Sequence, residues 1–218
     1  MKRPGPLLTL LAGLVLGLFL LTLNVTTGTK TVSSTQQEKS PTPAPTRSTA
    51  ASPTPTPSRT PVPAPDSDYA GRTADDAAAI AVSVRDGRAI AYFCDGHTRE
   101  SWLKGDVRDD GTLKLTGKNG AKLDGTLRDG RKIDGTVDVG GGHHAFTADR
   151  AKKPSGLWRA TATVRSAKID GGWIVLKDGT QVGILTRDGE PSPAPRIDPA
   201  TGAVTVDGQR LTARPATP

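Results

Sequence analysis

Hydrophobic and polar residues alternate through most of the chain after Asp66, and turn residues interrupt the alternation at regular intervals. This region holds all but four of the 25 glycines, many of them in Asp-Gly or Asn-Gly pairs. Alternation with period two is typical of strands that bury one face, and these pairs are typical of tight hairpin turns. The pattern therefore predicts an all-β domain of antiparallel strands, with no stretch that keeps a helical period.

Two-residue Asp-Gly turns predict two hairpins, one around Asp86-Gly87 and one around Asp178-Gly179. In each hairpin the register that brings the apolar faces together also fixes the cross-strand partners. The predicted pairs are Val84–Ala89, Val82–Ala91 and Ile80–Phe93 in the first hairpin, and Val175–Val182 and Trp173–Ile184 in the second.

The central region predicts a four-strand meander joined by three-residue loops that end in glycine. Its loops are Asp109–Gly111, Lys118–Gly120 and Arg128–Gly130. The predicted pairs are Leu103–Gly117, Gly105–Leu115, Leu115–Leu123, Leu123–Gly135 and Gly125–Ile133, so that large residues mostly meet small ones. An inner face indented by glycine suits a meander that curls into a barrel-like or strongly twisted sheet. The opposite face carries Lys104, Asp106, Lys114, Lys122, Asp124, Lys132 and Asp134 and is expected to be solvated.

The N-terminal third has a different pattern, in which residues 7–25 are a leucine-rich run without a charge. A helix of this length matches a hydrocarbon core of about 30 Å, so we predict a transmembrane signal-anchor helix. Lys2 and Arg3 precede the run, which predicts a short cytoplasmic N-terminus at residues 1–6 and a domain outside the plasma membrane. The alternative is a cleaved signal peptide and a secreted protein; the long run and the absence of an Ala-x-Ala-like site favour the anchor.

Proline, serine and threonine dominate residues 26–67, which predicts a disordered, polyproline-leaning linker. The β-rich domain is expected over residues 68–190. Prolines at Pro191–Pro195 then predict a break, followed by a small hairpin across Asp207-Gly208 and a tail that end the chain at residues 191–218.

The net charge of +7 does not indicate a nucleic-acid partner, because most of the excess lies before the β-rich domain. Residues 1–65 hold six basic residues and one acidic residue, so the remaining 23 basic and 21 acidic residues nearly cancel. The single cysteine, Cys94, excludes an intramolecular disulfide and is expected to be a small buried side chain.

No residue pattern predicts a catalytic, cofactor or metal site. His143 and His144 are adjacent and would face opposite ways on a strand, and His97 with Glu100 fits a solvated turn. Ser101 and Cys94 lack a nucleophile-elbow context. The carboxylate pairs Asp75-Asp76 and Asp109-Asp110 lie at predicted turns, where aspartate binds the backbone, and Gly140–Gly142 lacks a phosphate-binding signature.

Trp102 is the one candidate ligand-binding residue. The register that buries Leu103, Gly105 and Val107 turns Trp102 to the charged face. An outward tryptophan is either a platform for a sugar or a peptide, or a residue that a neighbouring strand or loop covers.

Four segments, AYFCDG at 91–96, WLKG at 102–105, GKNG at 117–120 and GWIVLKDGTQVG at 172–183, resemble exported actinobacterial proteins without an assigned activity. Those proteins are similar in plan, with one hydrophobic span, a Ser/Thr/Pro linker and a β-domain. The resemblance implies a shared fold and location and carries no catalytic residue across.

These observations favour a non-enzymatic module that binds a cell-wall component or an envelope protein, held to the membrane by residues 7–25. Two alternatives stay open: an extracytoplasmic hydrolase whose site is assembled from distant loops, and an extracytoplasmic sensory or regulatory domain. Only six residues precede the span, which leaves no room for a cytoplasmic signalling domain.

Overall fold

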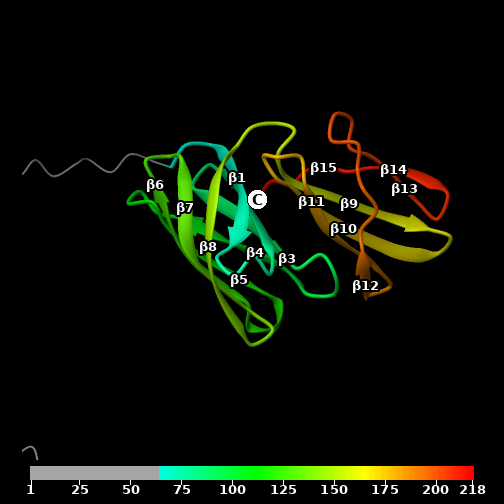
Figure 1. The fold of residues 1–218 in the computed structure, drawn as a ribbon, viewed down its shortest axis with the longest axis horizontal. Helices are drawn as coiled ribbons and strands as arrows, with labels where there is room; N and C mark the ends of the chain where they lie inside the picture. The colour runs from blue at the N-terminus through cyan, green and yellow to red at the C-terminus, as the bar shows by residue number, and fades with distance from the viewer. Residues whose placement is uncertain (1–63) are drawn as a thin grey trace, which may run out of the picture. The chain divides into compact units, whose positions relative to one another are not determined.

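The structure, a computed structural model, describes residues 64–218 and contains strands, turns and one short 3-10 turn, Lys118–Gly120 (Figure 1). These residues belong to one compact unit of the chain, Thr56–Pro218. The all-β prediction is confirmed. The predicted anchor at residues 7–25 lies outside the described residues, as does the linker up to residue 63. Within residues 64–218 no helix has the length and apolar character needed to cross a membrane.

The first eight strands form a closed antiparallel barrel in which each strand pairs with the next. The strands are β1 (Ser67–Thr73), β2 (Ala79–Arg85), β3 (Arg88–Cys94), β4 (Glu100–Val107), β5 (Thr112–Gly117), β6 (Lys122–Arg128), β7 (Lys132–Val139) and β8 (Gly142–Ala151). The barrel closes because β1 pairs with β2 on one side and with β8 on the other. The predicted meander is therefore confirmed as a closed barrel.

Alternate residues of each barrel strand point inward and fill the interior. Leu103, Leu113, Leu115, Leu123 and Ile133 are among its fully buried side chains. Inward glycines let neighbouring strands approach: a Cβ on Gly135 would lie 2.3 Å from the Asp124 carbonyl oxygen. Glycine at such positions permits the strong curl that a barrel of eight strands requires.

Most predicted barrel pairs are confirmed, including Val84 opposite Ala89, Gly105 opposite Leu115 and Leu115 opposite Leu123. The β6–β7 register is wrong by two residues. The loop consists of Asp129–Arg131 instead of Arg128–Gly130, because Asp129 and Gly130 form its turn with positive φ angles of 51° and 64°. As a result Leu123 lies opposite Val137, and Gly125 opposite Gly135. A shift of two keeps the same residues inside, so the buried pattern does not detect it.

The remaining strands form a five-stranded sheet in the order β12-β11-β10-β9-β15 and a separate hairpin, β13-β14. Their bounds are β9 (Gly156–Val164), β10 (Ala167–Val175), β11 (Gln181–Arg187), β12 (Glu190–Pro193), β13 (Ala203–Val206), β14 (Gln209–Thr212) and β15 (Arg214–Pro215). Residues 191–218, predicted as a break, a hairpin and a tail, supply most of β12, all of β15 and the confirmed hairpin. Val204 and Val206 of the hairpin are buried in one cluster with Trp173, so this segment is packed against the second sheet.

The β10–β11 register is wrong by one residue. Leu176 N–H donates to the Thr180 carbonyl at 2.8 Å, so the loop has three residues and Ile174, instead of Val175, lies opposite Val182. A shift of one exchanges the two faces of a strand. Here both faces are apolar: Ile174 packs toward the barrel and Trp173 packs away from it. The sequence pattern therefore contained no information that distinguishes the two registers.

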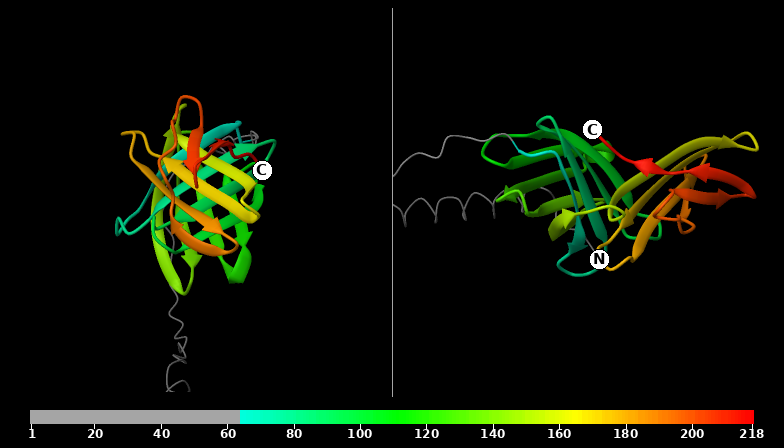
Figure 2. Two further views of the ribbon diagram at one scale, coloured as in Figure 1. Left: turned by 90° about the vertical axis from the view of Figure 1, so that its right-hand side faces the viewer. Right: turned by 90° about the horizontal axis from the view of Figure 1, so that it is seen from above.

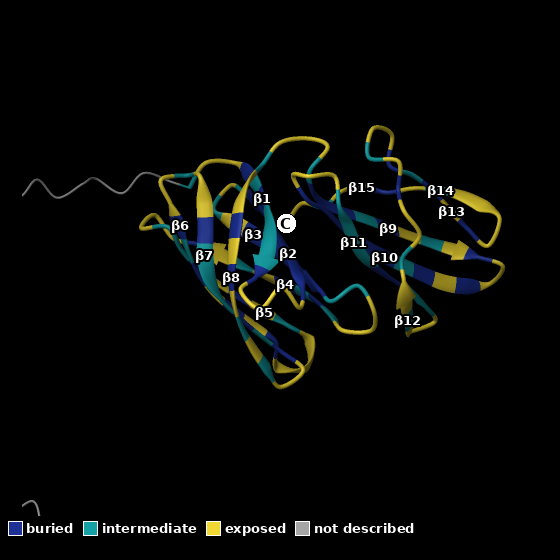
Figure 3. Ribbon diagram, in the orientation of Figure 1, coloured by how far each residue is buried: buried dark blue, intermediate teal, exposed yellow. Residues whose placement is uncertain are grey.

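The second sheet lies beside the barrel and covers the outer face of β2 and β3 (Figures 1 and 2). One buried cluster joins the two layers. Its members are Ala79, Ala81, Ile90, Tyr92 and Cys94 from the barrel and Leu157, Ile174, Leu176 and Ile184 from the second sheet and its loop. Figure 3 shows β2 as buried along most of its length. This contact holds both sheets in place around the cleft that they form.

Candidate functional site

A cleft of about 740 Å³ lies where β4 and β5 of the barrel meet the second sheet. The lining residues are Thr98, Arg99, Glu100, Ser101, Trp102, Lys104, Thr116, Gly117, Lys118, Asn119, Ala121, Val139, Gly140, Arg159, Asp170, Thr186 and Gly189. This volume is within the range of small-ligand sites, roughly 300 to 1,000 Å³. Both layers contribute side chains, so the site depends on their contact.

Strand β4 turns Trp102 outward, the direction that the register predicted, and the second sheet packs beside it. Tyr92 is its partner on β3, and the two rings lie tilted with centroids 4.3 Å apart. Gly172 of β10 makes room for this pair, because a Cβ there would lie 2.5 Å from Cζ of Tyr92 and 2.8 Å from Cζ2 of Trp102. The backbone of the second sheet can therefore pack directly against the aromatic pair.

Arg159 of β9 covers part of the indole, with its guanidinium carbon 4.5 Å from the centre of the Trp102 ring. Its Nε and Nη2 donate to the two carboxylate oxygens of Asp170 at 2.9 and 2.6 Å. This bidentate pair holds the guanidinium in a fixed plane and raises the pKa of Arg159. Trp102 is thus neither fully covered nor a bare platform: it is half-buried and lines the cleft beside a cation.

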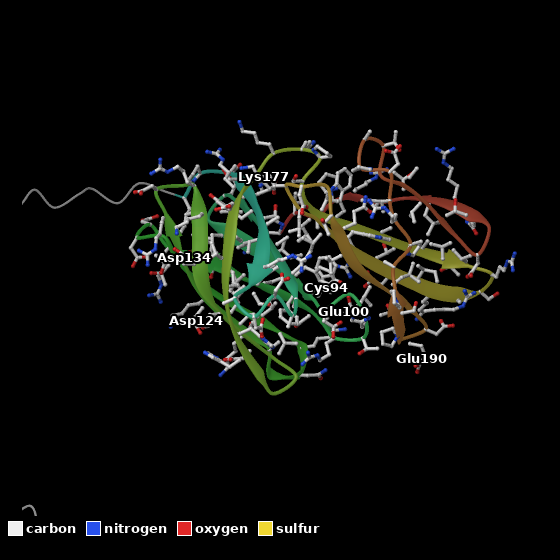
Figure 4. The ribbon with its side chains drawn as sticks, viewed as in Figure 1. Cys94, Glu100, Asp124, Asp134, Lys177 and Glu190 are labelled. Atoms are coloured by element: carbon white, nitrogen blue, oxygen red, sulfur yellow. The ribbon has the colours of Figure 1, made fainter. Side chains whose placement is uncertain are left out.

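Glu100 enters the cleft from the start of β4, between the barrel and the second sheet (Figure 4). The Tyr92 hydroxyl donates to its Oε2 at 2.5 Å. Burial raises the pKa of Glu100, and the negative charge of Asp170 raises it further, while the Tyr92 hydrogen bond and Arg159 oppose the shift. Both carboxylates of the cleft therefore already have strong partners.

Lys104 and Lys118 are exposed at the cleft and form no ion pair with any residue of the described part of the chain. Arg99 differs, since its Nε lies 3.3 Å from a carboxylate oxygen of Asp95. The opening of the cleft is consequently positive, and the two lysines are available to an anionic ligand.

The three histidines do not line the cleft. His97 is exposed near a turn, and His143 Nδ1 lies 2.5 Å from Asp138 on the barrel surface. His144 Nδ1 lies 3.0 Å from Asp75, and its buried Nε2 has no hydrogen-bond partner in the described part of the chain. The Thr73 hydroxyl and the His144 ring lower the pKa of Asp75 to about 2.

The other residues that the sequence offered as candidates lie in the core, at turns, or in the cleft without a catalytic partner. Cys94 is fully buried, and burial raises the pKa of its thiol to about 11. Asp110 accepts a hydrogen bond from the Thr112 backbone at 2.8 Å, as expected for a turn aspartate. Ser101 and Gly140 line the cleft, but no histidine accompanies them there. Within residues 64–218 no three His, Cys, Asp or Glu side chains gather as metal ligands would.

The sequence pattern singled out Trp102 but not Arg159, Asp170 or Glu100, which line the same cleft. Arg159 occupies one of the polar positions that alternate with apolar ones in its strand. Asp170 has the sequence context of a solvated strand residue. One available signal was the pair Gly171-Gly172 directly before the apolar run of a predicted strand, because a glycine inside a strand indicates close approach of another group. Comparison of the chain with protein-family models, with curated proteins and with solved structures finds no match.

Proposed function

We propose that this protein is a non-enzymatic binding module, anchored in the plasma membrane by residues 7–25, that binds a cell-envelope component outside the cell. The observation that supports this proposal is the cleft between the barrel and the second sheet. There Trp102 and Arg159 lie beside two lysines that have no ion-pair partner among residues 64–218. Such a mixture of one aromatic surface and a few polar groups that can contact a ligand is typical of a binding site.

The carboxylates of the cleft favour binding over catalysis. Asp170 is held by two hydrogen bonds from Arg159, and Glu100 accepts one from Tyr92. A general base needs a free lone pair within reach of a substrate proton, and these contacts use a lone pair on each oxygen of Asp170 and one on Oε2 of Glu100. They instead stiffen the wall on which Trp102 and Arg159 lie.

A hydrolase is the second candidate, and one observation favours it. Glu100 has a raised pKa and lies in the same cleft as Asp170, which forms an ion pair with Arg159. Two carboxylates in unlike environments are the pattern of an acid and a base in glycoside hydrolysis.

The test is co-sedimentation of the full-length protein, in an uncharged detergent, with cell-wall material freed of protein and lipid. We expect the wild type to sediment with the wall and the Lys104→Glu/Lys118→Glu variant to stay largely in the supernatant. Lys122→Glu is the matched control, because Lys122 is an exposed barrel lysine that does not line the cleft. Equal sedimentation of both variants would place the binding surface elsewhere, and release of soluble sugar would favour the hydrolase.

A further inference from the structure

We infer that the ligand of the cleft is an acidic saccharide, a sugar chain that carries carboxylate or phosphate groups. This inference rests on the proposed function and names the class of molecule that the cleft would bind. Three features of the lining support it: the balance of charge, the type of uncharged groups and the lack of apolar pockets.

Three cationic side chains of the cleft have N–H groups that can donate to a ligand. Arg159 uses Nε and Nη2 for Asp170, so Nη1 has no hydrogen-bond partner among the described residues. Lys104 and Lys118 add two ammonium groups. The two negative groups of the cleft already accept hydrogen bonds, Asp170 from Arg159 and Glu100 from Tyr92. A ligand that enters therefore meets donors and positive charge, which complement an anion.

The uncharged lining groups suit a saccharide. Thr98, Thr116 and Asn119 line the same cleft as Trp102 and carry hydroxyl and amide groups. Sugar hydroxyls pair with such groups, while the C–H face of a sugar ring packs against the open part of an indole.

An acidic peptide fits less well. Val139 is the one aliphatic side chain larger than alanine among the lining residues. Peptides and protein partners usually gain most of their affinity from large side chains seated in apolar pockets. The cleft offers one indole and no such pocket.

The experiment titrates full-length protein, in an uncharged detergent, with an oligogalacturonate and follows tryptophan fluorescence. Trp158 and Trp173 are 7% and 1% exposed, so a change reports mainly on Trp102. We expect saturable binding that weakens as salt is raised, because salt screens exposed charges. The methyl-esterified oligomer has the same sugars without the charge and is expected not to saturate.

The double variant Lys104→Gln/Lys118→Gln is expected to raise Kd about tenfold, as two exposed ionic contacts together would. Lys122→Gln is expected to keep the wild-type Kd. Equal Kd values for the acidic and the esterified oligomer, or for the double variant and the wild type, would overturn the inference.

Two further titrants identify the anion and the polymer. A mannose-1-phosphate oligomer that binds more tightly than the galacturonate assigns phosphate, and the reverse assigns carboxylate. Hexaglutamate that binds as tightly as either sugar shows a peptide ligand and overturns the saccharide. If no acidic sugar binds while the protein still sediments with cell wall through the cleft lysines, the ligand class is wrong and the proposed function stands. If sedimentation also fails, both are wrong.

Discussion

The two sides of the barrel wall have different sequences because they face different surroundings. On β5, β6 and β7 the outward residues are polar, among them the exposed Lys114 and Asp124, and the inward residues are buried aliphatic side chains or glycines. On β2 and β3 both faces are buried, with Val82 and Ala91 inside and Ala81 and Tyr92 outside. Strict alternation thus identifies a wall that meets water, and an apolar run in a barrel strand identifies a wall that a second layer covers.

A charge on the covered wall gives the largest expected effect. Ala81→Asp places a carboxylate on the outer face of β2, among Leu157, Ile174 and the other members of the buried cluster. An unpaired charge there is expected to lower the free energy of unfolding by about 3 kcal/mol or more, or to detach the second sheet. Urea unfolding of residues 64–218, with Trp102 fluorescence as a second readout, measures both.

Ala145→Asp is the matched control, because Ala145 is an exposed outward residue of β8. Its effect is expected to stay within about 0.5 kcal/mol. Similar losses for the two variants would mean that the walls do not differ in the way described.

Valine substitutions at two inward glycines test how tightly the strands of the exposed wall pack. Gly135→Val is expected to cost about 3 kcal/mol, because its Cβ would lie 2.3 Å from a backbone oxygen that cannot move aside. Gly125→Val is expected to cost about 1 kcal/mol, since its Cβ would meet Cγ2 of Ile133 at 3.1 Å and that side chain can shift. Thr126→Val is the control. If strand propensity alone decided, all three changes would stabilise the domain in denaturant melts.

The pH dependence at Glu100 gives the smallest effect. Burial raises its pKa in the folded state, so its ionisation destabilises the fold. This penalty is absent below about pH 4.3, the pKa of an unfolded glutamate, and grows as pH rises through the folded-state pKa. Glu100→Gln is therefore expected to equal the wild type in acid and to exceed it at neutral pH, by less than about 1 kcal/mol.

Asp75→Asn is expected to change the stability at neutral pH in the opposite direction to Glu100→Gln. The pKa of Asp75 is lowered to about 2, so its contribution is present above the unfolded pKa and is lost as pH falls toward 2. Its variant is expected to be less stable than the wild type at neutral pH and equal to it in acid. Chemical denaturation of each variant across pH 2 to about 8 measures the two trends. A Glu100→Gln variant that loses stability at neutral pH would contradict the account of the cleft.

The sequence predicted the barrel where local chemistry decides the outcome. Asp86-Gly87 fixes the β2–β3 register, and Gly111 and Gly120 fix the β4–β5 and β5–β6 loops, so those pairs agree with the structure. At Asp129-Gly130 two loop positions satisfy the same glycine and the same inner face, and the sequence does not distinguish them. At β10–β11 both faces are apolar, so burial does not identify the register.

The site was less predictable because its parts come from strands that are distant along the chain. Trp102 was identified from its outward register alone. Arg159 and Asp170 reach the cleft only because the second sheet packs against β3 and β4. No local sequence pattern predicts that packing. The residues that the sequence made conspicuous, the histidines and the glycine run, lie mostly at barrel loops and edges.

The covered wall also determines when the protein can finish folding. Synthesis proceeds from the N-terminus, and β1 obtains its second neighbour only when β8, which ends at Ala151, has been made. Even then the outer faces of β2 and β3 remain apolar and open to water until Ile184 and the strands around it arrive. A chain that emerges across a membrane would thus expose a barrel intermediate with an apolar outer surface while the last third of the chain is translated. Exposed apolar surface of this kind favours aggregation, so the export that we propose is expected to depend on a chaperone that holds the barrel until the second sheet closes over it.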